Sequence, residues 1–329
     1  MDWKRKNVLV TGATGFVGSW LTKSLVEKTA NVVVLIRDYF PSSPLFYDGT
    51  YPKVNAAKGD LIDYDTIRRI FNEYEIDTCL HVAAQPIVTI ANRNPIPTFQ
   101  TNIEGTWNIL EVSRKCETLE RLVITSTDKV YGEPSELPIT EEHPLNASYP
   151  YDASKACADI LARTYSVTYG LPIGITRCCN IYGGGDLNFS RIIPETVKAV
   201  LTGRSPVIRS DGTPVRDFIY IEDVVNAYLT LAENLSKKPI QGEAFNFGSN
   251  SPINILDLVN KIIEVSGKKI KPEVRGKKKP HAEIDEQYLS SKKAKKILGW
   301  KPKVPLEKGL KKTIKWYEEY FTKTSKESS

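Results

Sequence analysis

A glycine-punctuated turn, TGATGFVG, separates a β-branched run at residues 7–11 from a helix-like segment at 19–28. Glycines spaced three apart after a strand let the backbone approach a pyrophosphate and direct the N-terminus of the next helix at its charge. A glycine triplet alone also fits a plain tight turn, but this one directly follows an apolar strand, which favours a dinucleotide-binding turn. The turn residues predicted to contact the dinucleotide are Gly12, Gly15, Phe16, Val17 and Gly18.

The chain continues as an alternation of short apolar runs and segments with apolar residues at helical spacing. The run NVVVLI is continuous, as in a parallel strand buried on both faces. This alternation predicts an α/β fold, a Rossmann-type doubly wound parallel sheet with helices on both faces. The further expected strands are 31–36, 77–82, 121–126 and 172–177, and the further expected helices are 64–74, 100–115 and 151–169.

Beyond about residue 180 the pattern loosens into short strands, short helices and turn signals. We therefore expect a cofactor-binding domain over residues 1–178 and a smaller C-terminal α/β substrate domain over 179–329. The run at 217–231 has the pattern of one more strand and helix, so elements near 217–250 are expected to return to the first domain. The last expected helix spans 306–321.

The residues after the second expected strand decide which dinucleotide is favoured. An acid there accepts hydrogen bonds from the ribose hydroxyls of NAD, whereas a basic residue accommodates the 2′-phosphate of NADP. The strand-end position itself is Ile36, and Arg37 and Asp38 follow it. We predict NAD, with NADP as the alternative. After the next strand, Asp60 and Leu61 are expected to contact the adenine end, although Asp60 also fits a turn aspartate.

Composition excludes several classes of protein. The formal net charge is +6, and the conspicuous lysines fall in two late stretches, 267–279 and 292–301, which are expected on a solvated surface. No basic stripe with interleaved aromatic residues indicates a nucleic-acid partner. No apolar run is long enough to span a membrane, and the beginning lacks a signal-peptide pattern, so we expect a cytoplasmic protein. With three histidines and no CxxC spacing among five cysteines, we predict no metal site.

Tyr151 and Lys155 lie four residues apart at the start of a predicted helix, so both project from one face. A lysine ammonium beside a phenol favours the phenolate and lowers its pKa from the usual value of about 10. Such a tyrosine can exchange a proton with a sugar hydroxyl while hydride passes to nicotinamide. The Y-x-x-x-K spacing occurs often by chance, but it is informative after the glycine turn in a doubly wound chain.

These motifs together resemble the extended short-chain dehydrogenase/reductase family, over nearly the whole chain. Further landmarks are HVAAQ, NIEGTWNIL, STDKVYG, YDASK, RDFIYIEDVVNAY and ILGW. The resemblance implies an enzyme that acts on a nucleoside-diphosphate hexose. It also implies a homodimer that packs the helices near 100–115 and 153–169. By the same resemblance, Ala83 and Ala84 contact the cofactor, and Gln85, Asn180, Arg191 and Arg216 bind the substrate.

The residues after the strand at 121–126 indicate the branch of the family. Thr127 matches the residue that hydrogen-bonds the hydroxyl being oxidised. Dehydratases acting at sugar carbons 4 and 6 usually follow it with Asp-Glu, whereas epimerases have small residues. The pair here, Asp128-Lys129, resembles the CDP-glucose 4,6-dehydratase type. The resemblance makes Asp128 the acid and Lys129 the base, which requires a neutral amine; the two residues also fit a plain ion pair at a strand end.

The implied reaction is a redox-neutral conversion of a nucleoside-diphosphate hexose to its 4-keto-6-deoxy form. Two alternatives stay open on the sequence. A nucleotide-sugar 4-epimerase would share every motif except the use of Asp128 and Lys129. A non-catalytic NAD-binding regulator is the remote alternative, and the intact Tyr151, Lys155 and Thr127 argue against it. Arg177 is expected to brace the fold rather than to bind substrate.

Overall fold

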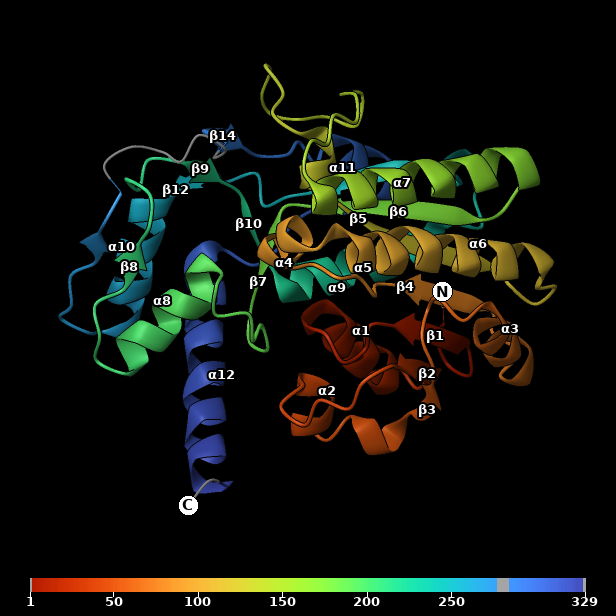
Figure 1. The fold of residues 1–329 in the computed structure, drawn as a ribbon, viewed down its shortest axis with the longest axis horizontal. Coiled ribbons are helices and arrows are strands. Elements are labelled where there is room, and N and C mark those ends of the chain that lie inside the picture. Colours follow the sequence, from red (N-terminus) through yellow and green to blue (C-terminus); the bar gives the residue numbers. More distant parts are fainter. Residues whose placement is uncertain (1, 277–283, 328–329) are drawn as a thin grey trace.

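The computed structural model describes residues 2–276 and 284–327. Within these residues, seven parallel strands form one sheet in the order β11-β6-β5-β4-β1-β2-β3 (Figure 1). This order reverses direction between β1 and β4, as in doubly wound sheets, and confirms the predicted fold. The strands are β1 (Asn7–Thr11), β2 (Asn31–Ile36), β3 (Asn55–Lys58), β4 (Thr78–His81), β5 (Arg121–Thr127), β6 (Ile173–Cys178) and β11 (Ala244–Phe247).

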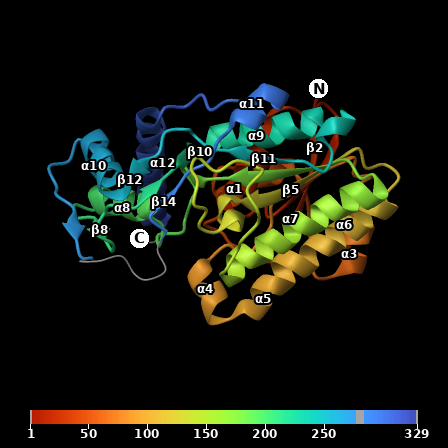
Figure 2. The same ribbon diagram turned by 90° about the horizontal axis from the view of Figure 1, so that it is seen from above.

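Helices cover both faces of the sheet (Figure 2). One face packs against α1 (Phe16–Glu27) and α9 (Ile221–Asn234). The other packs against α3 (Tyr64–Glu73), α6 (Gly105–Lys115) and α7 (Pro150–Tyr169). The segment Gln100–Glu104, which we expected as the first turn of α6, is a π-helical turn that follows α5 (Pro95–Phe99).

The continuous apolar strand runs follow from this double cover. In β1, Val8 and Val10 belong to the core on the α1 and α9 side, whereas Leu9 belongs to the core under α3, α6 and α7. All three side chains are fully buried. Burial of each contributes roughly 1.5–3 kcal/mol, so a polar residue at any of these positions would be costly.

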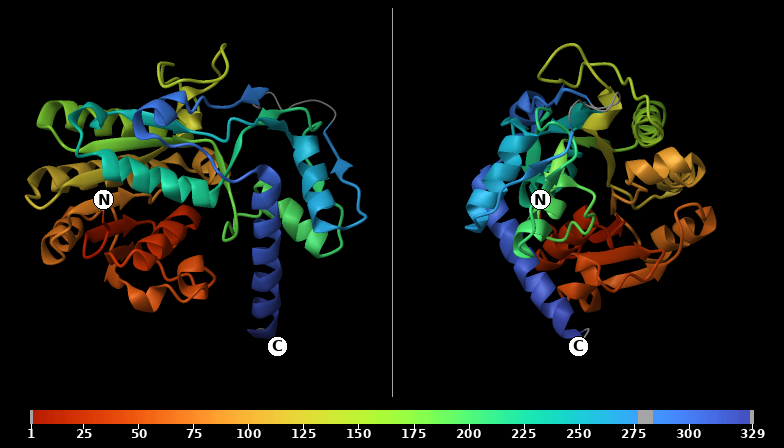
Figure 3. Two further views of the ribbon diagram at one scale, coloured as in Figure 1. Left: turned by 180° about the vertical axis from the view of Figure 1, so that it is seen from behind. Right: turned by 60° about the vertical axis from the view of Figure 1, so that its left-hand side comes forward.

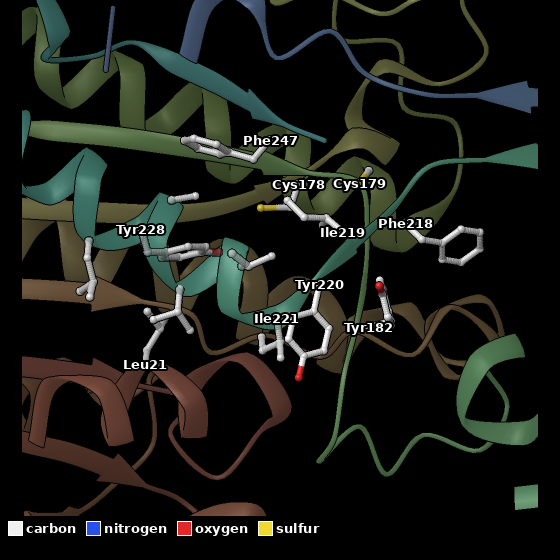
Figure 4. Close-up of a cluster of buried hydrophobic side chains, with 14 of the residues drawn as sticks. Leu21, Cys178, Cys179, Tyr182, Phe218, Ile219, Tyr220, Ile221, Tyr228 and Phe247 are labelled. Atoms are coloured by element: carbon white, nitrogen blue, oxygen red, sulfur yellow. The ribbon is translucent and has the colours of Figure 1, made fainter. Parts of the chain in front are cut away.

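The chain leaves the sheet after β6 and returns to it. Strand β11 pairs with β6 along the sheet edge, and α9 packs beside α1. In Figure 4, Cys178 and Phe247 from these adjacent strands lie near Tyr228 of α9. The Tyr228 hydroxyl donates a hydrogen bond to Thr125 Oγ1 at 2.8 Å. The part of the chain near 217–250 therefore contributes a strand, β11, to the parallel sheet and a helix, α9, to the layer that covers one of its faces. A domain boundary at residue 178 stays a prediction.

Most of the remaining C-terminal elements lie apart from the parallel sheet, with α12 beside α8 and α10 (Figure 3), whereas α11 packs against β11 and α9. No helix in the described ranges is both long enough and apolar enough to cross a bilayer. These elements are β7 (Asn180–Tyr182), α8 (Ile192–Leu201), β8 (Val207–Ile208), β9 (Val215–Arg216), β10 (Phe218–Tyr220), β12 (Ile253–Asn254), α10 (Ile255–Ser266), β13 (Glu273–Val274), β14 (Glu286–Gln287), α11 (Lys292–Leu298) and α12 (Leu306–Glu327).

Candidate active site

A cavity of about 890 Å³ lies where the carboxyl ends of the parallel strands meet the C-terminal elements. Open α/β sheets bind ligands at this position, outside the strand ends and at the reversal of strand order. The sequence-predicted residues that line the cavity are Gly12, Gly15, Phe16, Val17, Gly18, Arg37, Asp38, Asp60, Leu61, Ala83, Ala84, Thr127, Asp128, Lys129, Tyr151, Lys155, Asn180, Arg191 and Arg216. The fold thus brings together residues that lie up to about 200 positions apart in the sequence. Their individual roles stay predictions.

The glycine turn is closely packed. Gly12 has φ of 73°, which a side chain tolerates poorly, and a Cβ there would lie 2.7 Å from the backbone of Ala83. A Cβ on Gly18 would lie 2.1 Å from the carbonyl oxygen of Gly12. Gly15 differs, because its Cβ would meet only the Gly12 oxygen, at 3.3 Å. Two of the three glycines are therefore needed for the turn itself, and Gly15 borders open cavity.

At the far end of the cavity, Arg37 Nε donates to Asp38 Oδ2 at 2.7 Å, and both side chains are exposed. The opposite charges of Arg37 and Asp38 thus pair with each other. Asp60 Oδ1 accepts from the Ile62 backbone N–H at 3.3 Å, so the aspartate has the turn role as well as a place on the cavity wall.

The first two turns of α7 carry Tyr151 and Lys155 into the cavity. The expected lowering of the Tyr151 pKa by Lys155 is wrong. Burial raises the pKa of Tyr151 to about 12, against a partial lowering by Arg191 and further raising by Asp152 and Asp128. Burial also lowers the pKa of Lys155 to about 8, only partly offset by Asp159. Desolvation of the charged form is the largest cause of both shifts, because both ionisable groups are enclosed by protein.

Strand β5 ends at Thr127, and the 3₁₀ turn Asp128–Tyr131 begins at once. Thr127 Oγ1 donates to Asp128 Oδ1 at 3.0 Å, and Lys129 Nζ donates to Asp128 Oδ2 at 3.2 Å. The Asp128 side chain is 2% exposed and that of Lys129 is 27% exposed. The carboxylate is therefore enclosed and held from two sides, while the amine is partly open to the cavity.

The predicted substrate residues differ in how their polar groups are used. Asn180 Nδ2 donates to the Asp217 carbonyl at 3.1 Å, and Arg191 Nη1 pairs with Asp186 Oδ2 at 2.9 Å. Gln85 was predicted to bind substrate but is not among the residues lining the cavity. Its Oε1 accepts from the Ile87 N–H at 2.7 Å, which uses the amide in a local turn.

Arg216 directs its guanidinium to the backbone just before β14. Nη2 donates to the Ile284 carbonyl at 2.6 Å, and Nη1 donates to the Asp285 carbonyl at 3.3 Å. The acid next to Arg216 in sequence, Asp217, has another role, because it accepts from the Ser249 backbone N–H at 3.0 Å.

Two residues near the Asp128–Lys129 pair were missed by the sequence analysis. Asp152 is partly buried, and burial raises its pKa to about 6, with Lys129 lowering it and Asp128 raising it. Gln287 is fully buried, and its Oε1 accepts a hydrogen bond from Lys129 Nζ. Asp152 could have been found from its position next to Tyr151, whereas no local pattern marks Gln287, which lies 158 residues from Lys129.

Comparison with known proteins identifies the family to which the chain belongs. A sequence profile of the family described as GDP-mannose 4,6 dehydratase matches residues 9–313. The dTDP-glucose 4,6-dehydratase of Haemophilus influenzae is 32% identical, over 94% of this chain and 97% of its own length.

Solved structures of the same kind have a similar fold. That of dTDP-glucose 4,6-dehydratase from Bacillus anthracis in complex with NAD has a TM-score of 0.83 and 30% identity, covering 95% of this chain and 97% of that one. That of UDP-glucose 4-epimerase from Thermotoga maritima with UDP-glucose has a TM-score of 0.86 and 28% identity, covering 95% and 99%. The chain therefore belongs to the GDP-mannose 4,6-dehydratase family, within the extended short-chain dehydrogenases/reductases.

Proposed function

We propose that this protein is an NAD-dependent 4,6-dehydratase of a nucleoside-diphosphate hexose. The observation that carries the proposal is the hydrogen-bonded pair of Asp128 and Lys129, which lines one cavity with Thr127 and Tyr151. Removal of a 6-hydroxyl needs a proton donor and a base beside the sugar, in addition to the residues that serve oxidation at carbon 4. An epimerase has no use for this second pair.

The structure of the glycine turn at the cavity is suited to binding NAD. Gly12 and Gly18 admit no side chain, and Gly15 leaves the backbone before α1 open to the cavity, as a pyrophosphate requires. Bound there, NAD would supply a reversible hydride acceptor. Lys155 and Tyr151 stand on α7 across the same cavity, where they would orient the nicotinamide end and the sugar.

The sugar hydroxyl chemistry falls to Thr127 and Tyr151. Thr127 Oγ1 would hydrogen-bond the 4-hydroxyl. Tyr151 would have to be a phenolate, which the positive charge of a bound nicotinamide would favour against the burial that raises its pKa. Its Oη could then take the hydroxyl proton as hydride leaves carbon 4. The 4-ketone that results makes the proton on carbon 5 acidic, so a modest base suffices for its removal.

Elimination then falls to the neighbouring pair. In the structure Lys129 donates to Asp128, and one proton shift along this 3.2 Å hydrogen bond gives an amine and a carboxylic acid. The Lys129 amine removes the carbon 5 proton, and Asp128 protonates the 6-hydroxyl, which leaves as water. Lys129 would then return a proton to carbon 5, and carbon 6 would regain the hydride that bound NAD would supply. The proton held by Tyr151 replaces, through solvent, the one lost by Asp128, so the cycle closes without net redox change.

Substrate diphosphate would be bound by Arg216, Arg191 and Asn180, which line the C-terminal side of the cavity. Arginine suits this role through its planar, bidentate guanidinium. The Asp-Lys pair supports CDP-glucose as the substrate, whereas the relatives described above are named for dTDP-glucose and UDP-glucose.

The direct test is to incubate the protein with CDP-glucose, dTDP-glucose, UDP-glucose and GDP-mannose and to follow product mass. Loss of one water identifies a dehydratase, and an unchanged mass with inverted stereochemistry identifies a 4-epimerase, the alternative supported by the likeness to the Thermotoga epimerase. Asp128→Asn and Lys129→Met should each still produce transient nicotinamide absorbance yet release little 4-keto-6-deoxy product. Asp65→Asn, which removes a surface ion pair with Arg68, is a matched control.

We also propose a homodimer formed through α6 and α7, which pack against each other on one face of the sheet. Their outer surface exposes Trp107 on α6 and Ile160 and Val167 on α7. Apolar side chains gathered on an exposed helix pair favour contact with another protein surface. Trp107→Glu should convert a dimer to a monomer in sedimentation measurements, and an unaltered assembly would contradict this interface.

A further inference from the structure

Gln287 reaches the Asp128–Lys129 pair from a distant part of the chain. Its side chain is fully buried and its Oε1 accepts a hydrogen bond from Lys129 Nζ. Its Nε2 donates to the backbone carbonyls of Asp128 and Gly132, each at 3.3 Å. One glutamine thus contacts both ends of the turn that carries the pair.

These contacts fix which way the amide faces. If the amide were flipped, its NH₂ group would face the Lys129 amine, and its oxygen would face the two carbonyls of Asp128 and Gly132. Only the observed orientation pairs every donor with an acceptor. In a fully buried site an unpaired polar group costs about 1–3 kcal/mol, so the amide is held in place.

The backbone of Gln287 is held as well. Strand β14 pairs in parallel with β9, which places Gln287 opposite Arg216. Immediately afterwards, the Tyr288 carbonyl accepts from the Ile139 N–H at 3.0 Å, and the Ser290 N–H donates to the Ile139 carbonyl at 2.8 Å. The backbone of Gln287 is therefore held by β9 and by the segment at Ile139. The glutamine is a rigid support for the Lys129 amine and for the turn that carries it.

We propose that Gln287 is a positioning residue that orients the Lys129 amine for removal of the carbon 5 proton. Asp128 and Gln287 occupy two of the three positions around Nζ that are not bonded to carbon. Transfer of a proton to Asp128 first leaves the lone pair facing Asp128. A one-third turn about the Cε–Nζ bond then gives Asp128 and Gln287 one N–H each and points the lone pair at the third position, which is the one available to substrate because Lys129 lines the cavity. Without Gln287 the flexible lysine stem would have several rotamers and the lone pair no fixed direction.

The neutral character of the amide also matters. A second carboxylate here, beside that of Asp128, would oppose proton loss from Lys129 more strongly, and it would leave the carbonyls of Asp128 and Gly132 without their donors. A glutamine accepts from the amine without adding charge, so it opposes the proton shift to Asp128 less than a carboxylate would. This inference rests on the proposed dehydratase function, in which Lys129 is the base.

The test is a double-mutant cycle with Gln287→Met and Lys129→Met. Gln287→Met keeps the length of the side chain and should slow release of 4-keto-6-deoxy product by about 10–100-fold, since small misplacements of a reacting group cost that much. Transient nicotinamide absorbance, which reports oxidation at carbon 4, should persist. In the Lys129→Met background, adding Gln287→Met should change product release no further, because it acts through an amine already removed.

Several outcomes would overturn the inference. These are product release in Gln287→Met equal to the unmodified protein, an equal loss of both half-reactions, or an additive loss in the double variant. Gln241→Met is the matched control, since Gln241 donates to a backbone carbonyl (Leu235) remote from the cavity, and it should leave both half-reactions unchanged. If Gln287→Met does not fold, Gln287→Glu keeps the shape and should also block elimination while sparing oxidation; normal elimination in that variant would refute the role.

Failure of this inference is distinguishable from failure of the proposed function. If the unmodified protein releases no dehydrated product from any of the four sugar nucleotides, the proposed function is wrong. If it does, and only the Gln287 variants behave as the unmodified protein, the dehydratase assignment stands and the positioning role is wrong.

Discussion

Arg177 and Asp159 form a bidentate ion pair in which Nε and Nη2 each donate to a carboxylate oxygen at 2.8 Å. Both side chains are buried, and Nη1 of the same guanidinium donates to the Tyr131 hydroxyl at 2.8 Å. The pair joins β6 to α7, the helix that presents Tyr151 and Lys155. The support for this helix is therefore ionic as well as apolar.

Removal of one partner should be far more damaging than removal of both. Arg177→Met leaves the Asp159 carboxylate buried without a counter-charge and should lower the free energy of unfolding by about 3–5 kcal/mol. Arg177→Met combined with Asp159→Leu should recover most of the loss. Urea titration followed by circular dichroism measures both, with the exposed Arg68→Met as control. A single variant as stable as the unmodified protein would contradict the assigned role of the pair.

Tyr151→Phe should abolish turnover while leaving ligand binding nearly intact, because the ring keeps its packing and only the proton-carrying oxygen is lost. Positioned acid–base groups contribute roughly 10²–10⁴-fold to rate. Turnover of each nucleotide sugar and calorimetric titration with NAD test the two halves of this expectation. Retention of more than about a tenth of the original rate would show that another group carries the proton.

The two glycines Gly15 and Gly18 should respond differently to alanine. In Gly18→Ala the new Cβ would lie 2.1 Å from the Gly12 oxygen, so the turn must distort and the melting temperature should fall. In Gly15→Ala the new methyl group projects toward the cavity, so stability should hold and NAD affinity should fall. Thermal melts and NAD titrations on both variants provide the comparison; equal melting temperatures would be inconsistent with the packing at Gly18.

The rate constant kcat/KM should fall as pH rises above about 8. Burial lowers the pKa of Lys155 to about 8, so the free enzyme loses this positive charge beside Tyr151 above that pH. Unfolding is not the cause, because the unfolded lysine binds its proton up to a pKa of 10.5, and stability therefore rises with pH between the two values. Lys155→Arg should remove this falling limb at a lower maximum rate, and an unchanged limb would assign it to another group.

Cofactor choice tests the segment at the end of β2. Arg37 and Asp38 pair with each other on the surface, so either one can turn to a ligand at small cost. If Asp38 turns to the ribose hydroxyls, NAD should bind more tightly than NADP, and Asp38→Ala should narrow the difference. Tighter binding of NADP to the unmodified protein would instead give the decisive role to Arg37.

Much of the architecture is local and was predictable. The expected strands at 7–11 and 31–36 agree with β1 and β2 to the residue, since a buried parallel strand needs a continuous apolar run between turn residues. The expected helix at 19–28 begins earlier, at Phe16, because the glycine turn passes directly into α1. The final expected helix is present as α12 and is longer than its apolar pattern indicated.

The amino-acid sequence by itself determined the glycine turn, the Tyr151–Lys155 spacing and the Thr127-Asp128-Lys129 run, because each is a short-range pattern with a defined chemical purpose. Only the tertiary structure decided their surroundings. Burial, a property of the packed molecule, reversed the expected direction of the Tyr151 pKa. Gln287 meets Lys129 across 158 residues because β14 pairs with β9, and strand pairing between distant segments leaves no local trace in sequence. The spacing of apolar residues along the sequence predicts helices and strands, whereas desolvation and long-range contacts exist only once the chain has folded.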